Sequence, residues 1–293
     1  MNKALDEVEV QRQARAFIAP LDLQNISTDL SVYLQAANAI LRKEAMREGE
    51  SGETLTRPDG KHIITVNSSE SHERQRFTIC HEIAHIVMGL ASSHDSVPPW
   101  AYAKRHANEI ACDWFAAELL MPPQQWLAAV PKGEPSFDVI HQVADVFGCS
   151  FPAAASRYAT LTPAPCAFIT MEHGTVKYAV RSTALRRAKA WITPRSPIPQ
   201  GSVAHRVRAS KQSGVASDTV AQDVWFEDWE SGLDMTELSR HYGGSDTTVS
   251  ILWFEESDLP EREFDRFGRQ VQQDEGLSEL TGDLPWPGNK KRR

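Results

Sequence analysis

No stretch of this 293-residue chain approaches the roughly 18 consecutive apolar residues that a membrane-spanning helix needs, so the sequence predicts no membrane segment. The first residues, MNKALDEVEVQRQ, carry too many charges for a secretory signal, which favours a cytoplasmic location. The chain has only four cysteines, and none of them are closely paired in sequence. This spacing argues against a disulfide framework and fits a reducing compartment.

Net positive charge is also missing. The chain carries a formal charge of −8 at pH 7, which argues against a general affinity for nucleic acids, so we expect no direct nucleic-acid binding. Apolar residues are not scarce: 41% of the chain is hydrophobic, which is enough for a packed core. The sequence therefore predicts a folded protein long enough for one large domain or two ordinary ones.

The most informative motif is His-Glu-x-x-His, which lies inside the apolar helical segment RFTICHEIAH at residues 76–85. Because residues four apart share one face of an α-helix, His81 and His85 can direct two imidazoles at one metal ion. Glu82 lies about 100° further round the helix, where it can reach a water molecule bound to that metal. Zinc brings the pKa of such a water down to about 7. Glu82 would accept its proton and return it to the leaving amine.

The simpler alternative for this segment is an amphipathic helix with two histidines at its polar edge. The residues that flank the motif are mostly apolar, so the histidines would lie near a core, where polar groups without partners are costly. The motif therefore favours a zinc (Zn2+) hydrolase, with His81 and His85 as metal ligands and Glu82 as the catalytic base.

A second predicted helix, NEIACDWFAAELLMP at residues 108–122, carries two carboxylates four residues apart, Glu109 and Asp113. A catalytic zinc needs three protein ligands and one open position. Glu109 is the candidate third ligand, and Asp113 could accept the ring N–H of a ligating histidine. The alternative is an exposed acidic stripe. An all-histidine site is excluded because it would need Gly and His where the chain has Met88 and Ala91.

Three other polar residues, His106, Tyr102 and His72, are candidates for stabilising a developing oxyanion, and the sequence does not decide among them. His106 is also a weaker rival for the third ligand position. Two cysteines, Cys80 and Cys112, each adjoin a candidate site residue and could form a redox-sensitive element. We favour the simpler interpretation that both are small buried side chains.

The strings RFTICHEIAH and NEIACDWFAAELLMP resemble the ImmA/IrrE family of bacterial metallo-endopeptidases, and the resemblance covers about residues 10–160. It implies that His81, His85 and Glu109 are metal ligands and that Glu82 is the catalytic base. It also implies a protein substrate, commonly a helix-turn-helix transcriptional repressor whose cleavage relieves repression.

The chain departs from the family pattern at three positions near the motifs. Cys80 stands where a small apolar residue is usual, Ala84 where Gly is common, and Ala111 where many relatives have a second Glu. The last change leaves Glu109 as the single acidic candidate of that pair. None of the three departures removes a group that the chemistry requires.

The pattern along the chain predicts an α+β fold. Residues 1–162 are expected to form a zincin-like, mainly helical metallopeptidase domain, with helices over 1–48 and a small β-hairpin over 51–67 that turns at Pro58-Asp59-Gly60. Residues 166–257 are expected to form a smaller α+β domain, for which the family resemblance implies a regulatory or sensor-like role. Strands are predicted there at 166–171, 176–181, 223–229 and 247–254. An acidic segment and a disordered tail are expected over 258–293.

Residues 136–160 resemble a helix-turn-helix, with Gly148 in the turn and Pro152 near the start of the second helix. DNA reading is one interpretation. A helical hairpin that packs under the catalytic helices is the favoured one, because Arg157 is the single basic residue of the second helix. Two hypotheses therefore stand. The first is a zinc endopeptidase, which the intact Glu82 favours. The second is a non-proteolytic regulator whose metal site is structural or vestigial, or which binds DNA through 136–160.

Overall fold

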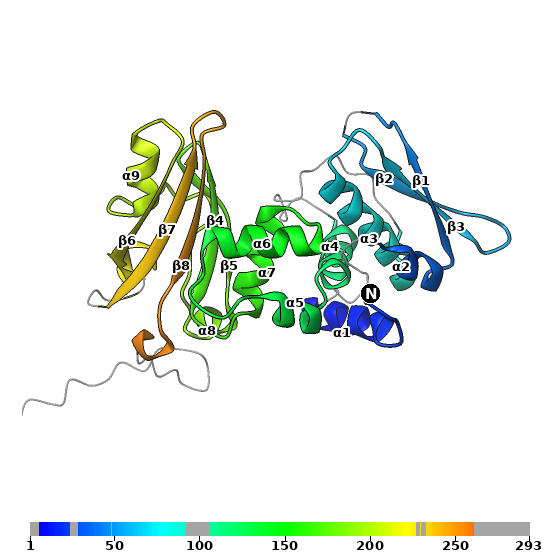
Figure 1. Ribbon diagram of the computed structural model, residues 1–293, viewed down its shortest axis with the longest axis horizontal. Helices are drawn as coiled ribbons and strands as arrows, with labels where there is room; N and C mark the ends of the chain where they lie inside the picture. Colours follow the sequence, from blue (N-terminus) through cyan, green and yellow to red (C-terminus); the bar gives the residue numbers. More distant parts are fainter. Residues whose placement is uncertain are drawn as a thin grey trace, which may run out of the picture. The chain divides into compact units, whose positions relative to one another are not determined.

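The computed structural model describes residues 6–23, 29–47, 49–91, 106–226, 229 and 233–260. The chain divides into two units after Asp258, and every element described below belongs to the first unit. The elements confirm the α+β class (Figure 1). The domain boundary predicted near 162–166 stays a prediction, and almost all of the predicted acidic tail lies outside the described residues.

The N-terminal segment is only partly helical. Helices α1 (Glu7–Ile18) and α2 (Ser31–Ala36) are followed by strand β1 (Ala39–Glu44), so the prediction of helix over all of 1–48 is wrong. The reason is non-local: β1 pairs in parallel with strand β3 (His62–Asn67), and sheet pairing of this kind overrides local helix propensity. Asn38 separates α2 from β1 with a φ of 51°, a left-handed conformation that asparagine tolerates well.

The predicted hairpin over 51–67 is confirmed. Strand β2 (Gly52–Thr56) pairs antiparallel with β3, and the turn between them closes with hydrogen bonds between the backbones of Arg57 and Lys61 and of Gly60 and Arg57. Gly60 adopts a φ of 78°, which favours glycine. The sheet order is β1-β3-β2, so β2 is an edge strand.

Two long helices carry the motifs and pack against each other: α3 (His72–Met88) and α4 (Ala107–Leu120). Helix α3 also packs against β2 and β3 (Figure 1). The loop between the two helices, which the sequence placed at 91–100, lies outside the described residues apart from Ala91. The short helix α5 (Pro123–Ala129) follows α4 after Pro122.

The predicted helical hairpin is confirmed as helices α6 (Phe137–Phe147) and α7 (Phe151–Leu161). Gly148 closes α6 with a φ of 54°, and Pro152 lies in the first turn of α7. The hairpin joins the core that contains α3 and α4, and Phe151 also stacks edge-on against Phe168 of the second sheet at 6.0 Å between ring centroids. Arg157 is buried, so the basic residue that DNA reading would need does not face solvent.

The second sheet is antiparallel throughout and has the order β5-β4-β8-β7-β6 (Figure 1). Its strands are β4 (Cys166–Glu172), β5 (Thr175–Arg181), β6 (Gly214–Ala221), β7 (Asp234–Tyr242) and β8 (Thr247–Trp253). The strands predicted at 166–171, 176–181 and 247–254 are therefore confirmed. The short helix α8 (Thr183–Arg187) packs on β4 and β5, and η3 (Glu256–Asp258) follows β8.

The strand predicted at 223–229 is wrong. The 3-10 turn η2 (Gln222–Val224) begins the segment, and the aromatic residues after it bury their rings without alternating between two faces. The rings of Phe226 and Trp229 pack at 4.6 Å between centroids, and Trp225 donates its indole N–H to Glu237 at 2.9 Å. The aromatic residues of this segment are typical of a strand, which is why a strand was predicted. The packing of their rings instead favours a turn.

Helix α9 (Val203–Ala209) is held on this sheet by a buried carboxylate. Glu237 accepts hydrogen bonds from the backbone N–H groups of Val203 at 2.9 Å and Ala204 at 2.7 Å. Each of these groups would otherwise lack an intrahelical partner. Among the described residues, no helix is both long enough and apolar enough to cross a membrane.

Candidate metal centre

Helix α3 brings the motif to the site. Its N-terminus is capped by Ser71, whose hydroxyl accepts the backbone N–H of Arg74. The helix then continues without interruption to Met88, so His81 and His85 lie one turn apart on one face, as the spacing predicts. Both imidazoles are buried, and their Nε2 atoms lie 3.1 Å apart.

The C-terminal end of α3 orients His85. Gly89 adopts a left-handed φ of 64°, and the backbone N–H of Leu90 returns to the carbonyl of His85 at 3.1 Å, which is a Schellman ending. The same turn places the Leu90 carbonyl 3.1 Å from Nδ1 of His85. A carbonyl only accepts, so Nδ1 carries the hydrogen and the lone pair of the neutral ring lies on Nε2, toward His81.

Helix α4 supplies the carboxylates. Nδ1 of His81 lies 2.9 Å from Oδ1 of Asp113, and Nε2 of His81 lies 3.0 Å from Oε2 of Glu109. The other oxygen of Glu109 lies 3.5 Å from Nε2 of His85. Asp113 therefore holds the outer nitrogen of one ring, while Glu109 and the two Nε2 atoms converge.

The three converging groups fit a small metal ion. Zinc binds nitrogen and carboxylate oxygen at about 2.0–2.2 Å in tetrahedral geometry, so two such donors lie about 3.4 Å apart. The three donor-to-donor distances are 3.1, 3.0 and 3.5 Å. Two imidazoles and a carboxylate are also donors that suit zinc. The residues present therefore fit the metal that the motif implies.

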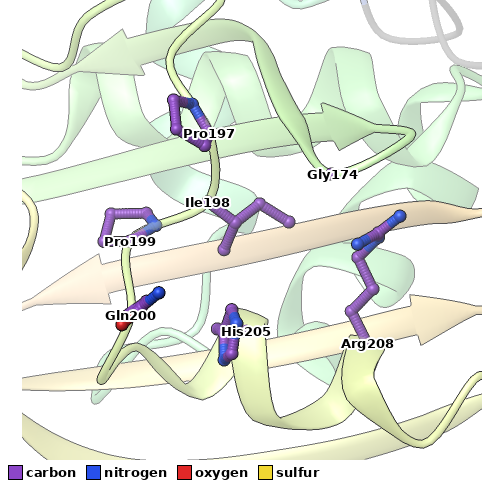
Figure 2. Close-up of a pocket in the computed structure, with 7 residues that line it drawn as sticks. All are labelled: Gly174, Pro197, Ile198, Pro199, Gln200, His205 and Arg208. Carbon is purple, nitrogen blue, oxygen red and sulfur yellow. The ribbon is translucent and has the colours of Figure 1, made fainter.

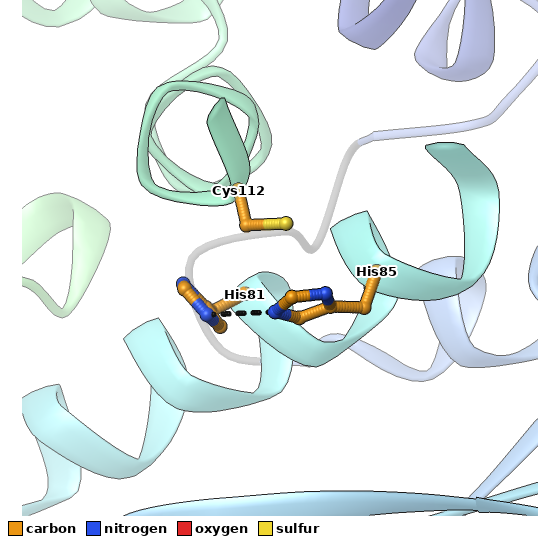
Figure 3. A group of neighbouring side chains, drawn as sticks. All are labelled: His81, His85 and Cys112. Atoms are coloured by element: carbon orange, nitrogen blue, oxygen red, sulfur yellow. Dashed lines mark hydrogen bonds between the residues drawn. The ribbon is translucent and has the colours of Figure 1, made fainter. Parts of the chain in front are cut away.

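A buried thiol lies next to the same cluster. Cys112, on α4, has its sulfur within 4.8 Å of the ligand nitrogens of His81 and His85 (Figure 3). Glu109 comes closer to both rings, at 3.0 and 3.5 Å, and is the better third ligand on distance. From the sequence, Cys112 was interpreted as a redox element or a small buried side chain, and not as a metal ligand.

Glu82 is held from the edge strand of the first sheet. It is buried, and its Oε2 accepts a hydrogen bond of 2.7 Å from the hydroxyl of Thr54 on β2. Thr54 was missed in the sequence analysis because a contact between a strand and a helix leaves no local spacing signal. The contact fixes Oε2 of Glu82, so that Oε1 is the oxygen that can accept a proton from another group.

Of the three candidate oxyanion stabilisers, two lie among the described residues, and both are exposed. His72 is exposed at the first residue of α3, nine residues before His81, which corresponds to about 13 Å along the helix. His106 is exposed and caps α4, where its Nδ1 accepts the backbone N–H of Asn108. Tyr102 lies outside the described residues. The role of oxyanion stabiliser therefore stays unassigned.

The carboxylates raise the affinity of His81 for a proton. Burial by itself lowers the pKa of this imidazole, but the hydrogen bonds to Asp113 and Glu109 outweigh it, and the pKa rises to about 9. The metal-free ring therefore carries a positive charge at neutral pH, which satisfies both carboxylates. A metal ion has to displace this proton, because only a neutral imidazole is a ligand.

All four cysteines are buried, and none forms a disulfide. Burial raises the pKa of Cys149 and of Cys166 to about 12, because the interior does not stabilise a thiolate. We expect both thiols to resist iodoacetamide at mildly alkaline pH in the native protein and to react after unfolding in denaturant. Mass spectrometry of the alkylated peptides measures this difference. Rapid native labelling of either thiol would show that the packing around it is wrong.

A cavity of about 350 Å³ lies elsewhere, beside the second sheet (Figure 2). Its lining is Gly174, Pro197, Ile198, Pro199, Gln200, His205 and Arg208. Arg208 donates two hydrogen bonds of 2.8 Å to the carboxylate of Asp246. These hydrogen bonds are the main cause that lowers the pKa of Asp246. The guanidinium is therefore already neutralised by the protein, and the cavity does not share the chemistry of the metal centre.

Comparison with known proteins agrees with these features. Residues 37–158 match the family model of the IrrE N-terminal-like domain, Peptidase M78. The predicted resemblance to the ImmA/IrrE family is therefore confirmed for this segment. No curated protein matches the chain.

Among solved structures, the chain is similar to a Mycobacterium tuberculosis transcriptional regulator. The TM-score is 0.56 at 14% identity, over 84% of this chain and 87% of that one. At this identity the likeness shows a shared fold alone.

Proposed function

We propose that the chain is a zinc-dependent endopeptidase, because residues 37–158 match the family model of the IrrE N-terminal-like domain of a peptidase family. The observation that carries the proposal is the convergence of two imidazoles and one carboxylate beside a second buried carboxylate, Glu82. His81, His85 and Glu109 would hold the metal, and Asp113 and the Leu90 carbonyl would fix the two rings.

Each residue then has one task. When bound, zinc would supply Lewis acidity toward the scissile carbonyl and toward a water molecule. Glu82 takes the proton of the attacking water at Oε1, because Thr54 occupies Oε2. It then returns that proton to the leaving amine. The carboxylate of Asp113, at Nδ1, keeps His81 oriented throughout.

The substrate we propose is a helix-turn-helix transcriptional repressor in the cytoplasm. The resemblance to the ImmA/IrrE family supports this class of substrate. The fold shared with a protein described as a transcriptional regulator is consistent with a role in transcription control. To test the proposal, new protein N-termini would be compared by mass spectrometry between cells that carry the chain and cells that lack it. Cleavage within a DNA-binding repressor is the expected result, and an unchanged set of N-termini would contradict it.

The non-proteolytic alternatives have less support. A structural zinc site does not need a carboxylate base, yet Glu82 is buried at the site and held in place by Thr54. DNA reading through α6 and α7 would need an exposed basic face, whereas Arg157 is buried and bonded to Glu118.

Thr54 is expected to act on the rate through Glu82. A hydrogen bond to a charged group contributes about 1.5–3 kcal/mol, and about 1.4 kcal/mol corresponds to a tenfold change in rate. We expect Thr54→Val, which keeps the shape and removes the hydroxyl, to lower kcat by about tenfold with little change in KM. Thr54→Ser should restore most of the rate. Steady-state kinetics on the cleaved peptide measure both variants, and an equal loss in the Val and Ser variants would rule out the hydrogen bond as the cause.

A further inference from the structure

The inner face of α4 presents three donors to the histidines of α3. Glu109, Cys112 and Asp113 lie three and four residues apart, so they share one side of the helix. All three are buried. Glu109 and Asp113 each contact His81, and the side chain of Cys112 lies beside the two histidine rings (Figure 3). The proposed set of three ligands leaves one vertex of the metal for a further donor.

The distances allow the thiol to bind the same ion. The ligand atoms of His81, His85 and Cys112 all lie within 4.8 Å of one another. Zinc binds sulfur at about 2.3 Å and nitrogen at about 2.0–2.1 Å, so in a tetrahedral site sulfur and nitrogen lie about 3.6 Å apart. The sulfur therefore needs an approach of at most about 1.2 Å. A movement of this size is a small side-chain adjustment and needs no rearrangement of α4.

We propose that Cys112 is a fourth donor to the metal, so that the resting site has a closed set of two histidines, one glutamate and one cysteine. The inference rests on the proposed function, because it uses the same ion and the same three ligands. Four protein ligands are the mark of a closed zinc site, whereas a catalytic site keeps one position for water. The thiol releases its proton when it binds the ion, since only the thiolate is a ligand. The resting peptidase is therefore latent, and it becomes active when Cys112 regains a proton and leaves the ion and water takes its place.

The thiol also bears on which metal the site selects. Thiolate ligands favour zinc over magnesium, calcium or manganese, which prefer oxygen ligands. A site of two imidazoles and one carboxylate discriminates less strongly among these ions. Cys112 would therefore make the latent site more selective for zinc than the open one.

Cobalt substitution tests the proposal without an activity assay. Co2+ alone is added to the metal-free full-length protein, and the absorption spectrum is recorded together with the cobalt bound per chain. A thiolate ligand produces an intense charge-transfer band in the near ultraviolet, while nitrogen and oxygen ligands give only weaker visible bands. We expect the near-ultraviolet band in the wild type and its loss in Cys112→Ala, with one cobalt per chain retained in both. Cys80→Ala, which removes a buried thiol next to His81, is the matched control and should keep the band.

The outcomes separate this inference from the proposed function. A wild-type protein that binds one cobalt without the near-ultraviolet band would overturn the role of Cys112 and leave the three-ligand peptidase site intact. A band that persists in Cys112→Ala would also overturn it, because another thiol would then be the ligand. A wild type that binds no cobalt would defeat the proposed metal site itself. Where Cys112→Ala fails to fold, the wild type and Cys80→Ala decide together: a band present in both supports Cys112, and a band absent from the wild type or lost in Cys80→Ala overturns its role.

Discussion

Glu82→Gln is expected to lower the rate of peptide hydrolysis by about 10²–10⁴-fold while the protein keeps its fold and its zinc. Glutamine has the size of glutamate, and its amide oxygen can still accept the hydroxyl of Thr54. It cannot take a proton from the attacking water, so the chemical step loses its base. The rate is measured with a peptide substrate that contains the cleaved bond. The zinc content per chain is measured by inductively coupled plasma mass spectrometry.

The matched control for this variant is His81→Ala. It removes a ligand nitrogen that lies 3.1 Å from that of His85, so we expect it to lose the metal as well as the activity. The two variants then differ in zinc content and agree in the absence of cleavage. A Glu82→Gln protein that still cleaves at the wild-type rate would contradict the role of Glu82. A Glu82→Gln protein that loses its zinc would show that this carboxylate is a ligand.

Arg157→Ala is expected to lower the free energy of unfolding by about 3–5 kcal/mol, because it removes the buried one of the two cations that pair with the carboxylate of Glu118. Arg157 is 5% exposed and donates to the fully buried carboxylate of Glu118 at 2.6 Å. It also donates twice to the carbonyl of Met121, at 3.0 and 2.6 Å. After the substitution Glu118 keeps only the half-exposed Arg15 among these cations, at 2.9 Å. The Met121 carbonyl loses both donors.

Denaturant unfolding measures this change, with Arg206→Ala as the control. Arg206 pairs with Asp218 at a similar distance, 2.7 Å, but both side chains are about half exposed. Exposed pairs contribute about 0–1 kcal/mol, so the control should change stability little. Equal effects of the two substitutions would contradict the structural role of Arg157. That result would also reopen the interpretation of α7 as a DNA-reading helix.

The parts of the site that depend on helical spacing could be predicted from the sequence. His81, Glu82 and His85 lie within five residues of one helix, and Glu109 and Asp113 lie within five residues of another, so local periodicity is enough to place each pair on one face. Gly60 in the turn between β2 and β3, Gly148 between α6 and α7, and the strand-forming residues of β4, β5 and β8 are also local signals. These are the elements that the structure has where the sequence expects them.

The contacts that the sequence did not reveal join segments far apart in the chain. Thr54 on strand β2 reaches Glu82 on helix α3. Likewise, β1 becomes a strand only because β3 is available to pair with it. The carbonyl of Leu90 has no side-chain signal and is positioned by the left-handed turn at Gly89. At Trp225 a local signal was misleading. The aromatic composition there predicted a strand, whereas the structure has a turn with buried rings.

The most direct test of the metal centre is an anomalous difference map from a crystal of the zinc-loaded protein, with data collected at the zinc absorption edge. The account predicts one strong peak about 2.0–2.2 Å from Nε2 of His81, Nε2 of His85 and the carboxylate of Glu109, with Glu82 outside bonding distance. A map without a peak at these three residues, or with its peak at another group of side chains, would contradict it.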